Sequence, residues 1–324
     1  MRALVRAGDK TTLAFDPNHA EPTTSQHPDC YLIRPKASAI CRDELKWPEP
    51  LTPDIPVPGL DVAGEIIATP MTTTETPKFK VGDEIFALTT HTWVGNAREV
   101  SVAHERELAS KPQNLTWEEA ASVPLSALSA YQGLFVHGGL STDDNRNNGK
   151  RVLITAASGG VGIWGIQLAH QAGGVTELVG TCGTANVDFV KSLGAGIVLD
   201  YRKTTLVDWV HEDWDARAFD VVLDCVGGDT LSGAWTCVRE GGRVVSVAEP
   251  PNGKKPADGV RAEVEGVWFI VKPNGQQLVD ITRWIEQGRC RAVVDSVFEL
   301  EQFREAFARS EGGHAKGKVV FKMC

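Results

Sequence analysis

The first third of the chain alternates short apolar runs with prolines and glycines. Apolar runs over residues 31–33, 61–67 and 84–88 are bounded by turn-forming residues, a pattern typical of β-strands. The opening residues 1–6 are expected to form a first strand. We therefore predict an all-β region from residue 1 to about residue 115.

The pattern changes at Thr116. In the sequence Thr116-Trp117-Glu118-Glu119, the Thr116 hydroxyl can accept a hydrogen bond from the Glu119 amide, while the Glu119 carboxylate reaches back to the start of the helix. This capping box predicts a helical section that runs to about Val136 with a break at Pro124. The polar residues 141–149 that follow are expected to connect this section to a second fold.

From Lys150 onward, strand and helix patterns alternate. Continuous runs of Val, Ile and Leu are typical of strands that are buried on both faces of a parallel sheet. The prediction is therefore an α/β fold with a Rossmann doubly wound parallel sheet. The expected strands are 151–155, 178–181, 197–199, 221–224 and 243–247, and the expected helices are 163–171 and 187–193. After them we expect a helix over 276–287, a strand over 293–298, a helix over 302–309 and a last strand over 318–321.

A glycine-rich turn lies between the first of these strands and its helix. Ala156, Gly159 and Gly162 have the A-x-x-G-x-x-G spacing, a variant of the dinucleotide fingerprint. Gly159 allows the backbone to approach a pyrophosphate, and Gly162 allows the helix to pack closely. An isolated turn of this kind is equally well explained as a tight helix start, but the flanking alternation of strands and helices favours cofactor binding. The expected cofactor-binding residues here are Ala157, Ser158, Gly159, Gly160 and Val161.

The residues after the second strand decide which nicotinamide cofactor is expected. An acidic residue at this place usually binds the ribose 2′-hydroxyl of NAD, and residues 181–186 contain none. A 2′-phosphate could accept hydrogen bonds from the Thr184 hydroxyl, the Asn186 amide and nearby backbone amides. We therefore predict NADPH as the cofactor, with Thr181, Gly183, Thr184 and Asn186 among its contacts.

Length, composition and charge exclude several classes of protein. The 324 residues suggest two domains, and 42% hydrophobic with 23% charged residues indicates a compact globular protein. A net charge of −9 argues against a nucleic-acid partner. No apolar run is long enough for a membrane span and no signal peptide is recognisable, so we expect a cytoplasmic location and no membrane partner. The seven cysteines form no C-x-x-C pair and are expected to be reduced thiols.

Six segments resemble one family across nearly the whole chain. They are 56–64 (PVPGLDVAG), 80–87 (KVGDEIFA), 120–131 (AASVPLSALSAY), the glycine turn, 193–195 with 200–202 (LGA and DYR), and 313–318 (GHAKGK). In these segments the chain resembles the zinc-independent quinone oxidoreductase-like (enoyl reductase-like) branch of the medium-chain dehydrogenase/reductase superfamily.

The resemblance implies a GroES-like β-barrel domain over 1–120 that is completed by 290–324, a Rossmann NADPH-binding domain over 121–289, and an active site in the cleft between them. It assigns Tyr201 to the adenosine 2′-phosphate. Many relatives have a lysine where this chain has Val187, and Arg202 could replace that lysine. The implied contacts near the nicotinamide are Val226, Val247, Phe269, Ile270 and Val271.

Zinc-dependent relatives hold a catalytic metal with a Gly-His-Glu motif and two cysteines, and a structural metal with four closely spaced cysteines. This chain has Gly59-Leu60-Asp61 at the first position and lacks the four-cysteine lobe. Leu60 cannot bind a metal. We therefore expect no metal, and we expect Cys41 to be a buried or pocket-lining thiol.

Without a Lewis acid, the expected acceptor is one whose own conjugation spreads the arriving negative charge. Hydride transfer to an enone, enal, enoyl group or quinone leaves an enolate or quinol anion that is then protonated. No catalytic acid is assigned, because Tyr31 falls in a core strand, Tyr201 is assigned to the cofactor, and Tyr131 is expected to pack on the helix that bridges the domains. Protonation by solvent, or with help from residues 41–44, is the expectation.

The expected substrate is small, hydrophobic and conjugated. Residues that the family places around the cleft are Cys41, Asp43, Trp47, Trp93 and Phe269, although the tryptophans could equally be ordinary core residues. Two alternatives stay open: a catalytically weak cofactor-binding or partner-binding protein on the same fold, and a trans-acting enoyl reductase of polyketide biosynthesis. The resemblance is compatible with a homodimer.

Overall fold

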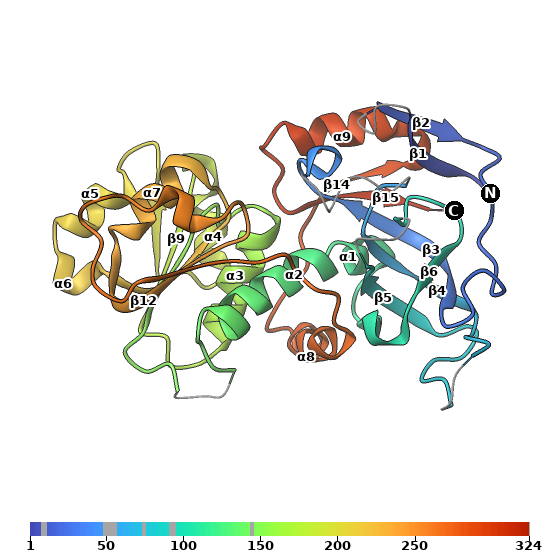
Figure 1. Ribbon diagram of the computed structural model, residues 1–324, viewed down its shortest axis with the longest axis horizontal. Helices are drawn as coiled ribbons and strands as arrows, with labels where there is room; N and C mark the ends of the chain where they lie inside the picture. Colours follow the sequence, from blue (N-terminus) through green and yellow to red (C-terminus); the bar gives the residue numbers. More distant parts are fainter. Residues whose placement is uncertain (8–11, 48–56, 73–75, 91–94, 143–145, 324) are drawn as a thin grey trace. The chain divides into compact units, whose positions relative to one another are not determined.

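A computed structural model describes residues 1–7, 12–47, 57–72, 76–90, 95–142 and 146–323. The chain forms two compact units, which are described separately (Figure 1). Unit 1 contains residues 1–128 and 272–324, and unit 2 contains residues 129–271. The chain therefore begins in unit 1, forms all of unit 2, and then returns to unit 1.

Unit 2 is built on a sheet of six strands that are all parallel. The order β10-β9-β8-β11-β12-β13 is the Rossmann order 3-2-1-4-5-6. The direction of strand succession reverses between β8 and β11, and ligands of such sheets bind at the carboxyl ends of the strands at this reversal. The strands are β8 (Arg151–Ile154), β9 (Glu177–Cys182), β10 (Ile197–Asp200), β11 (Phe219–Asp224), β12 (Val238–Ser246) and β13 (Glu265–Trp268).

The helices of unit 2 lie between the strands along the chain. Their apolar sides contribute to a core in which Phe219, Val222 and Trp235 are almost wholly buried. Sequence patterns predicted α3 and α4 but missed α5, α6 and α7, which are short. The helices are the π-helix η3 (Gln132–His137), α3 (Gly160–Gln171), η4 (Thr184–Asn186), α4 (Val187–Ser192), α5 (Leu206–His211), α6 (Trp214–Arg217), α7 (Gly228–Trp235) and η5 (Pro251–Lys254).

Unit 1 is a β domain assembled from segments on both sides of unit 2. In its seven-stranded sheet, β15 pairs in parallel with β14 and antiparallel with β3, so red and blue segments are neighbours in Figure 1. A separate two-stranded sheet contains β1 (Ala3–Ala7) and β2 (Thr12–Asp16). The other strands are β3 (Tyr31–Ile40), β4 (Asp61–Ala68), β5 (Glu84–Leu88), β6 (Ser101–Ala103), β7 (Leu108–Ser110), β14 (Val294–Glu299) and β15 (Lys318–Lys322).

The predicted capping box at Thr116 is confirmed. The Glu119 amide donates to the Thr116 hydroxyl over 3.2 Å, and the Thr116 amide donates to the Glu119 carboxylate over 2.9 Å. Pro124 begins the next helix, where its missing N–H is tolerated. The helices that begin in unit 1 are η1 (Glu44–Lys46), η2 (Glu105–Glu107), α1 (Trp117–Ala121), α2 (Pro124–Tyr131), α8 (Gly275–Glu286), η6 (Leu300–Gln302) and α9 (Phe303–Glu311).

The expected fold class, a Rossmann sheet with a GroES-like β domain, is confirmed, but the boundaries differ from those predicted. Helix α8 belongs to unit 1, although the sequence placed it in the Rossmann domain. The reason is close packing: a Cβ on Gly275 would lie 2.2 Å from the Leu108 carbonyl oxygen, and the Asn114 side-chain amide donates to the Ile285 carbonyl over 2.9 Å. Unit 1 also extends to Leu128 rather than to residue 120.

Two further sequence expectations concern the thiols and the membrane. Among the described residues, the cysteines Cys30, Cys41, Cys182, Cys225, Cys237 and Cys290 are all free. Within the same residues, every helix is too short or too polar to cross a bilayer.

Candidate functional site

The glycine turn after β8 is held against the neighbouring strand β9. The Ala157 amide donates to the Thr181 carbonyl over 2.8 Å, and the Ala156 amide donates to the Thr181 hydroxyl over 3.2 Å. Ala156 adopts a φ of 47°, a left-handed conformation that is uncommon for a residue with a Cβ. Thr181 therefore positions the turn through both its main chain and its side chain.

The first turn of helix α3 lies very close to the main chain of this glycine turn. A Cβ on Gly162 would lie 2.2 Å from the Ala156 carbonyl oxygen, so only glycine fits. The helix begins at Gly160, three residues before the expected start, with Gly159 as its N-cap. The first-turn amides of a helix have no intrahelical acceptor, and together with the helix dipole they form an anion-binding site. This geometry fits a dinucleotide pyrophosphate.

The structure brings a carboxylate to the end of β9 that the local sequence did not indicate. Asp200 ends β10, which pairs with β9 in the register Asp200 to Cys182. The Thr184 hydroxyl donates to Asp200 Oδ2 over 2.7 Å, and this hydrogen bond is the main cause that lowers the pKa of Asp200. An acid therefore lies beside residues 181–186, but both of its oxygens already accept hydrogen bonds, from the Thr184 hydroxyl and from the Arg202 amide. Thr184 consequently does not supply the free hydroxyl donor that we expected for a phosphate.

Phenol and guanidinium groups lie beside Gly183. A Cβ on Gly183 would be 3.1 Å from Tyr201 Oη and 3.7 Å from Arg202 Nε. Tyr201 is 59% exposed, although it is a large aromatic residue. The Arg202 amide meanwhile donates to Asp200 Oδ1 over 3.0 Å. Tyr201 and Arg202 thus offer donors to a phosphate where Thr184 does not.

Asn186, the other expected phosphate donor, lies next to Ser158. Its side-chain amide donates to the Ser158 hydroxyl over 3.2 Å. This contact links the segment after β9 to the glycine turn after β8. The structure therefore brings together the two stretches, 157–161 and 181–186, that the sequence analysis assigned to the cofactor.

A buried carboxylate organises the carboxyl ends of three strands. Asp224, at the end of β11, accepts hydrogen bonds from the Thr155 hydroxyl over 3.0 Å and from the Ser246 hydroxyl over 2.9 Å. The Gly227 amide donates to the same side chain over 3.0 Å. Burial raises the pKa of Asp224, and these donors oppose that rise. Sequence patterns gave no sign of this residue, because its partners are distant in the chain.

The expected nicotinamide contacts follow three adjacent strands. Val226 comes after β11 and is 50% exposed, Val247 follows β12, and Phe269 follows β13. The Phe269 ring lies 4.4 Å from the His137 ring, with an angle of 32° between their planes. Ile270 is half-buried and Val271 is buried at the end of unit 2. Val226, Val247 and Phe269 thus lie beyond the carboxyl ends of three adjacent strands.

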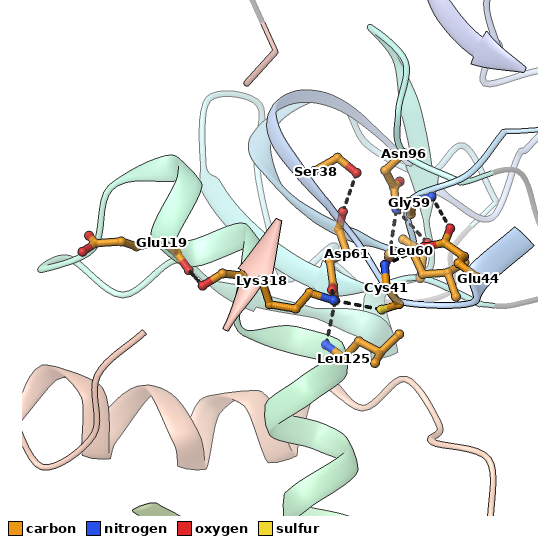
Figure 2. Close-up of polar contacts among 12 residues, drawn as sticks. Ser38, Cys41, Glu44, Gly59, Leu60, Asp61, Asn96, Glu119, Leu125 and Lys318 are labelled. Atoms are coloured by element: carbon orange, nitrogen blue, oxygen red, sulfur yellow. Dashed lines mark hydrogen bonds and ion pairs between the residues drawn. The ribbon is translucent and has the colours of Figure 1, made fainter. Parts of the chain in front are cut away.

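In unit 1, an ammonium group lies beside Cys41 and Asp61, where the sequence analysis considered a catalytic zinc. Figure 2 shows Lys318 Nζ between Cys41 Sγ, at 2.8 Å, and Asp61 Oδ2, at 3.1 Å. Asp61 also accepts a hydrogen bond from the Leu125 amide over 2.6 Å. Burial acts to lower the pKa of Lys318, but Cys41 and Asp61 raise it overall. Because a cation already neutralises Asp61 and Leu60 offers no ligand atom, the residues here do not fit a zinc ion.

The loop that follows β3 is committed to structure. The Glu44 carboxylate is buried and accepts hydrogen bonds from the amides of Gly59 and Cys41. Burial raises the pKa of Glu44, and the two amides oppose this effect. Burial also raises the pKa of the Cys41 thiol to about 12. The expectation that this loop assists protonation is therefore not supported by its geometry.

The residues expected to line the substrate pocket belong to both units. Cys41, Asp43 and Trp47 belong to unit 1 and Phe269 belongs to unit 2, while Trp93 lies outside the described residues. The Asp43 amide donates to Glu311 over 2.7 Å.

The three tyrosines lie in different surroundings. Tyr31 is a core residue, as predicted, and donates to Glu105 over 2.6 Å. Tyr131 packs edge-on against Phe135, with ring centres 4.9 Å apart. Tyr201 remains the exposed one of the three.

Comparisons with known proteins identify the family of this chain. A family model described as zinc-binding dehydrogenase matches residues 193–321. A probable zinc-binding oxidoreductase, mitochondrial, from Arthroderma benhamiae is 44% identical over 297 residues, which are 90% of this chain and 88% of that protein. The chain belongs to the quinone oxidoreductase and enoyl reductase branch of the medium-chain dehydrogenase/reductase superfamily.

Two further proteins extend the comparison. An NADPH-dependent alkenal/one oxidoreductase, chloroplastic, from Arabidopsis thaliana is 31% identical over 82% of this chain and 63% of its own length. The structure of the quinone oxidoreductase from Coxiella burnetii has a TM-score of 0.81 at 24% identity and covers 100% of this chain and 99% of its own. That structural match supports the fold.

The relatives also correct the expected location. The Arthroderma benhamiae relative is named as mitochondrial and the Arabidopsis thaliana relative as chloroplastic. The prediction of a cytoplasmic protein is therefore wrong. It depended only on the lack of a recognisable signal, which is weak ground for a location.

The two glycines of the turn give a first prediction. It distinguishes the role of glycine in helix packing from its role in letting the cofactor approach the backbone. Gly162→Ala places a methyl group 2.2 Å from a carbonyl oxygen, so both the melting temperature and NADPH affinity should fall, the latter at least tenfold. At Gly159 the nearest atom to a new Cβ is 3.3 Å away, so Gly159→Ala should keep the melting temperature but weaken NADPH binding. Thermal melts and fluorescence titration measure the two effects. Gly253→Ala, with no atom within 4 Å of the new Cβ, is the neutral control. Unchanged NADPH affinity in Gly162→Ala would contradict the assignment.

The buried ion pair generates a second prediction. Lys318→Met leaves the Asp61 carboxylate buried without its cation, which should reduce the free energy of unfolding by about 3–5 kcal/mol. Adding Asp61→Asn should restore part of that loss, because the amide is uncharged and keeps an oxygen for the Leu125 amide. Urea denaturation measures both variants. Lys322→Met, at the exposed end of the same strand, should change stability by no more than about 0.5 kcal/mol. A loss of the same small size in Lys318→Met would refute the role of the pair.

Proposed function

We propose that this oxidoreductase uses NADPH to reduce small conjugated carbonyl compounds or quinones, without a zinc ion at Cys41. The observation that carries the proposal is the anion site at the start of α3, together with Tyr201 and Arg202 beside Gly183. The name of the Arabidopsis thaliana relative, which includes both NADPH and alkenal/one substrates, supports the same cofactor and acceptor class. Membership of the quinone oxidoreductase branch supports quinones as acceptors.

The residues of this chain would hold the cofactor at its two ends. First-turn amides of α3 face the pyrophosphate, while Tyr201 and Arg202 donate to the 2′-phosphate. Val226, Val247 and the stretch Phe269-Ile270-Val271 provide an apolar surface for the nicotinamide. When bound, the cofactor supplies a hydride. The chain itself contributes orientation and exclusion of water rather than Lewis-acid chemistry at Leu60 and Asp61.

The geometry favours water as the source of the proton that follows the hydride. Glu44 is held by two backbone amides, and the Cys41 thiol has a pKa of about 12 and lies against Lys318. A conjugated acceptor spreads the negative charge over its own π-system after hydride arrives. Such an enolate or quinol anion can take a proton from solvent without a dedicated acid.

The activity itself provides a third prediction. Purified protein should oxidise NADPH in the presence of enones, enals or quinones but not of saturated ketones, and with NADP⁺ it should leave primary alcohols unoxidised. Absorbance of the reduced nicotinamide follows the reaction, and Gly162→Ala serves as the cofactor-binding control. Tyr131→Phe should retain turnover, because this ring packs against Phe135. Binding of NADPH without oxidation by any conjugated acceptor would favour a catalytically weak binding protein on the same fold.

Cofactor preference gives a fourth prediction. Arg202→Ala should raise the KM for NADPH about tenfold and leave the KM for NADH unchanged, because only the 2′-phosphate loses a charge-assisted donor. Steady-state kinetics with both cofactors measure the ratio. Arg304→Ala, on α9 of unit 1, is the matched control for loss of an exposed arginine. Equal changes with NADPH and NADH would show that Arg202 does not distinguish them.

A further inference from the structure

Three potential metal-binding side chains meet in unit 1, in a cluster separate from Cys41 and Asp61. Asp29 and Cys30 directly precede β3, and His104 directly follows β6. These strands pair antiparallel, with Tyr31 opposite Ala103, so Cys30 and His104 are the next cross-strand neighbours. The sheet therefore fixes two of the three side chains relative to each other.

Each of the three residues brings one possible ligand atom into a small space, and these three atoms lie within 4.8 Å of one another. Cys30 Sγ lies 3.6 Å from His104 Nδ1 and 3.5 Å from Asp29 Oδ1, and His104 Nδ1 lies 3.5 Å from Asp29 Oδ2. With ordinary zinc–ligand bond lengths and tetrahedral angles, the expected edges are about 3.4–3.6 Å. The separation of Cys30 Sγ and His104 Nδ1 matches such an edge. The Asp29 carboxylate meets the sulfur through one oxygen and the imidazole through the other, so this exposed side chain must rotate for one oxygen to complete the set.

Burial and chemistry favour zinc among the common metals. Cys30 is completely buried and the His104 side chain is 14% exposed, while the Asp29 side chain is 61% exposed. Asp29 and His104 also line an open cavity of about 670 Å³ that includes Lys78, Glu105 and Arg106. One thiolate, one imidazole and one carboxylate are a ligand set that suits zinc, and the open side leaves room for water as a fourth ligand.

The same distances also allow hydrogen bonds in the metal-free protein. Burial, with a further contribution from Asp29, raises the pKa of the Cys30 thiol to about 12, so the sulfur is protonated without a cation. A divalent ion reverses this preference, because it binds the thiolate and releases the proton.

We propose that Asp29, Cys30 and His104 bind one zinc ion, with water completing a tetrahedral site. The ion links the segment before β3 to the end of β6 and stabilises this edge of unit 1. It takes no part in the hydride transfer proposed above. Our sequence expectation of no metal considered the Gly59-Leu60-Asp61 position and the missing four-cysteine lobe, whereas Cys30 and His104 are 74 residues apart and share no spacing motif.

Cobalt substitution tests the site directly. Purified full-length protein, freed of metal with a chelator, is titrated with Co²⁺, and the thiolate-to-cobalt charge-transfer band is recorded. We expect one equivalent to bind with this band and zinc to displace the cobalt. Cys30→Ser should abolish the band, and His104→Gln and Asp29→Asn should each weaken Co²⁺ binding at least tenfold.

Matched variants keep the test decisive. Cys41→Ser should leave the band intact, which separates this site from the position of catalytic zinc in relatives. Cys290→Ser controls for the loss of another buried thiol. If Cys30→Ser fails to fold, His104→Gln carries the test. Absence of Co²⁺ binding at micromolar concentration, a band that survives Cys30→Ser and His104→Gln, or a band lost in Cys41→Ser would overturn the proposal. NADPH oxidation is measured separately, so its absence does not affect this outcome.

Discussion

The contact between the Lys318 ammonium and the Asp61 carboxylate is a buried ion pair on which the end of the unit 1 sheet depends. Both groups are buried, and an ion in a protein interior is costly unless its counter-charge is adjacent. Lys318 begins β15, Asp61 begins β4 and Cys41 follows β3, so the pair joins the ends of three neighbouring strands. Through the Leu125 amide, Asp61 also fixes the start of α2. A metal ion beside Cys41 and Asp61 would have to replace the Lys318 ammonium, so the metal ion and the ion pair cannot be present together.

Unit 2 also contains a buried carboxylate, but its charge is compensated in a different way. There hydroxyl and amide donors from the ends of three strands surround the buried Asp224 carboxylate. Those strand ends are where the proposed nicotinamide contacts Val226 and Val247 lie. The two units thus position their candidate functional residues with buried carboxylates, one compensated by an ion pair and the other by hydrogen bonds.

Structural features that depend on residues close together in the sequence could be predicted. The capping box at Thr116, the glycine turn and the alternation of strands and helices after Lys150 all rest on contacts within a few residues, and the structure agrees with them. Features that depend on contacts between residues far apart in the sequence could not be predicted. Asp200 reaches Thr184 through strand pairing, and α8 joins unit 1 through Leu108. No local pattern encodes such contacts, because they depend on which strands become neighbours.

The position of β15 has a consequence for how the protein is made. This strand lies between β14 and β3, yet all of unit 2 separates it from β3 along the chain. A ribosome that adds about 5–20 residues per second needs roughly 15–55 s to pass from Ile40 to Lys318. During that interval the side of β3 that later pairs with β15 has no partner and is open to wrong pairing. Unit 2, whose residues are contiguous, can complete its sheet first.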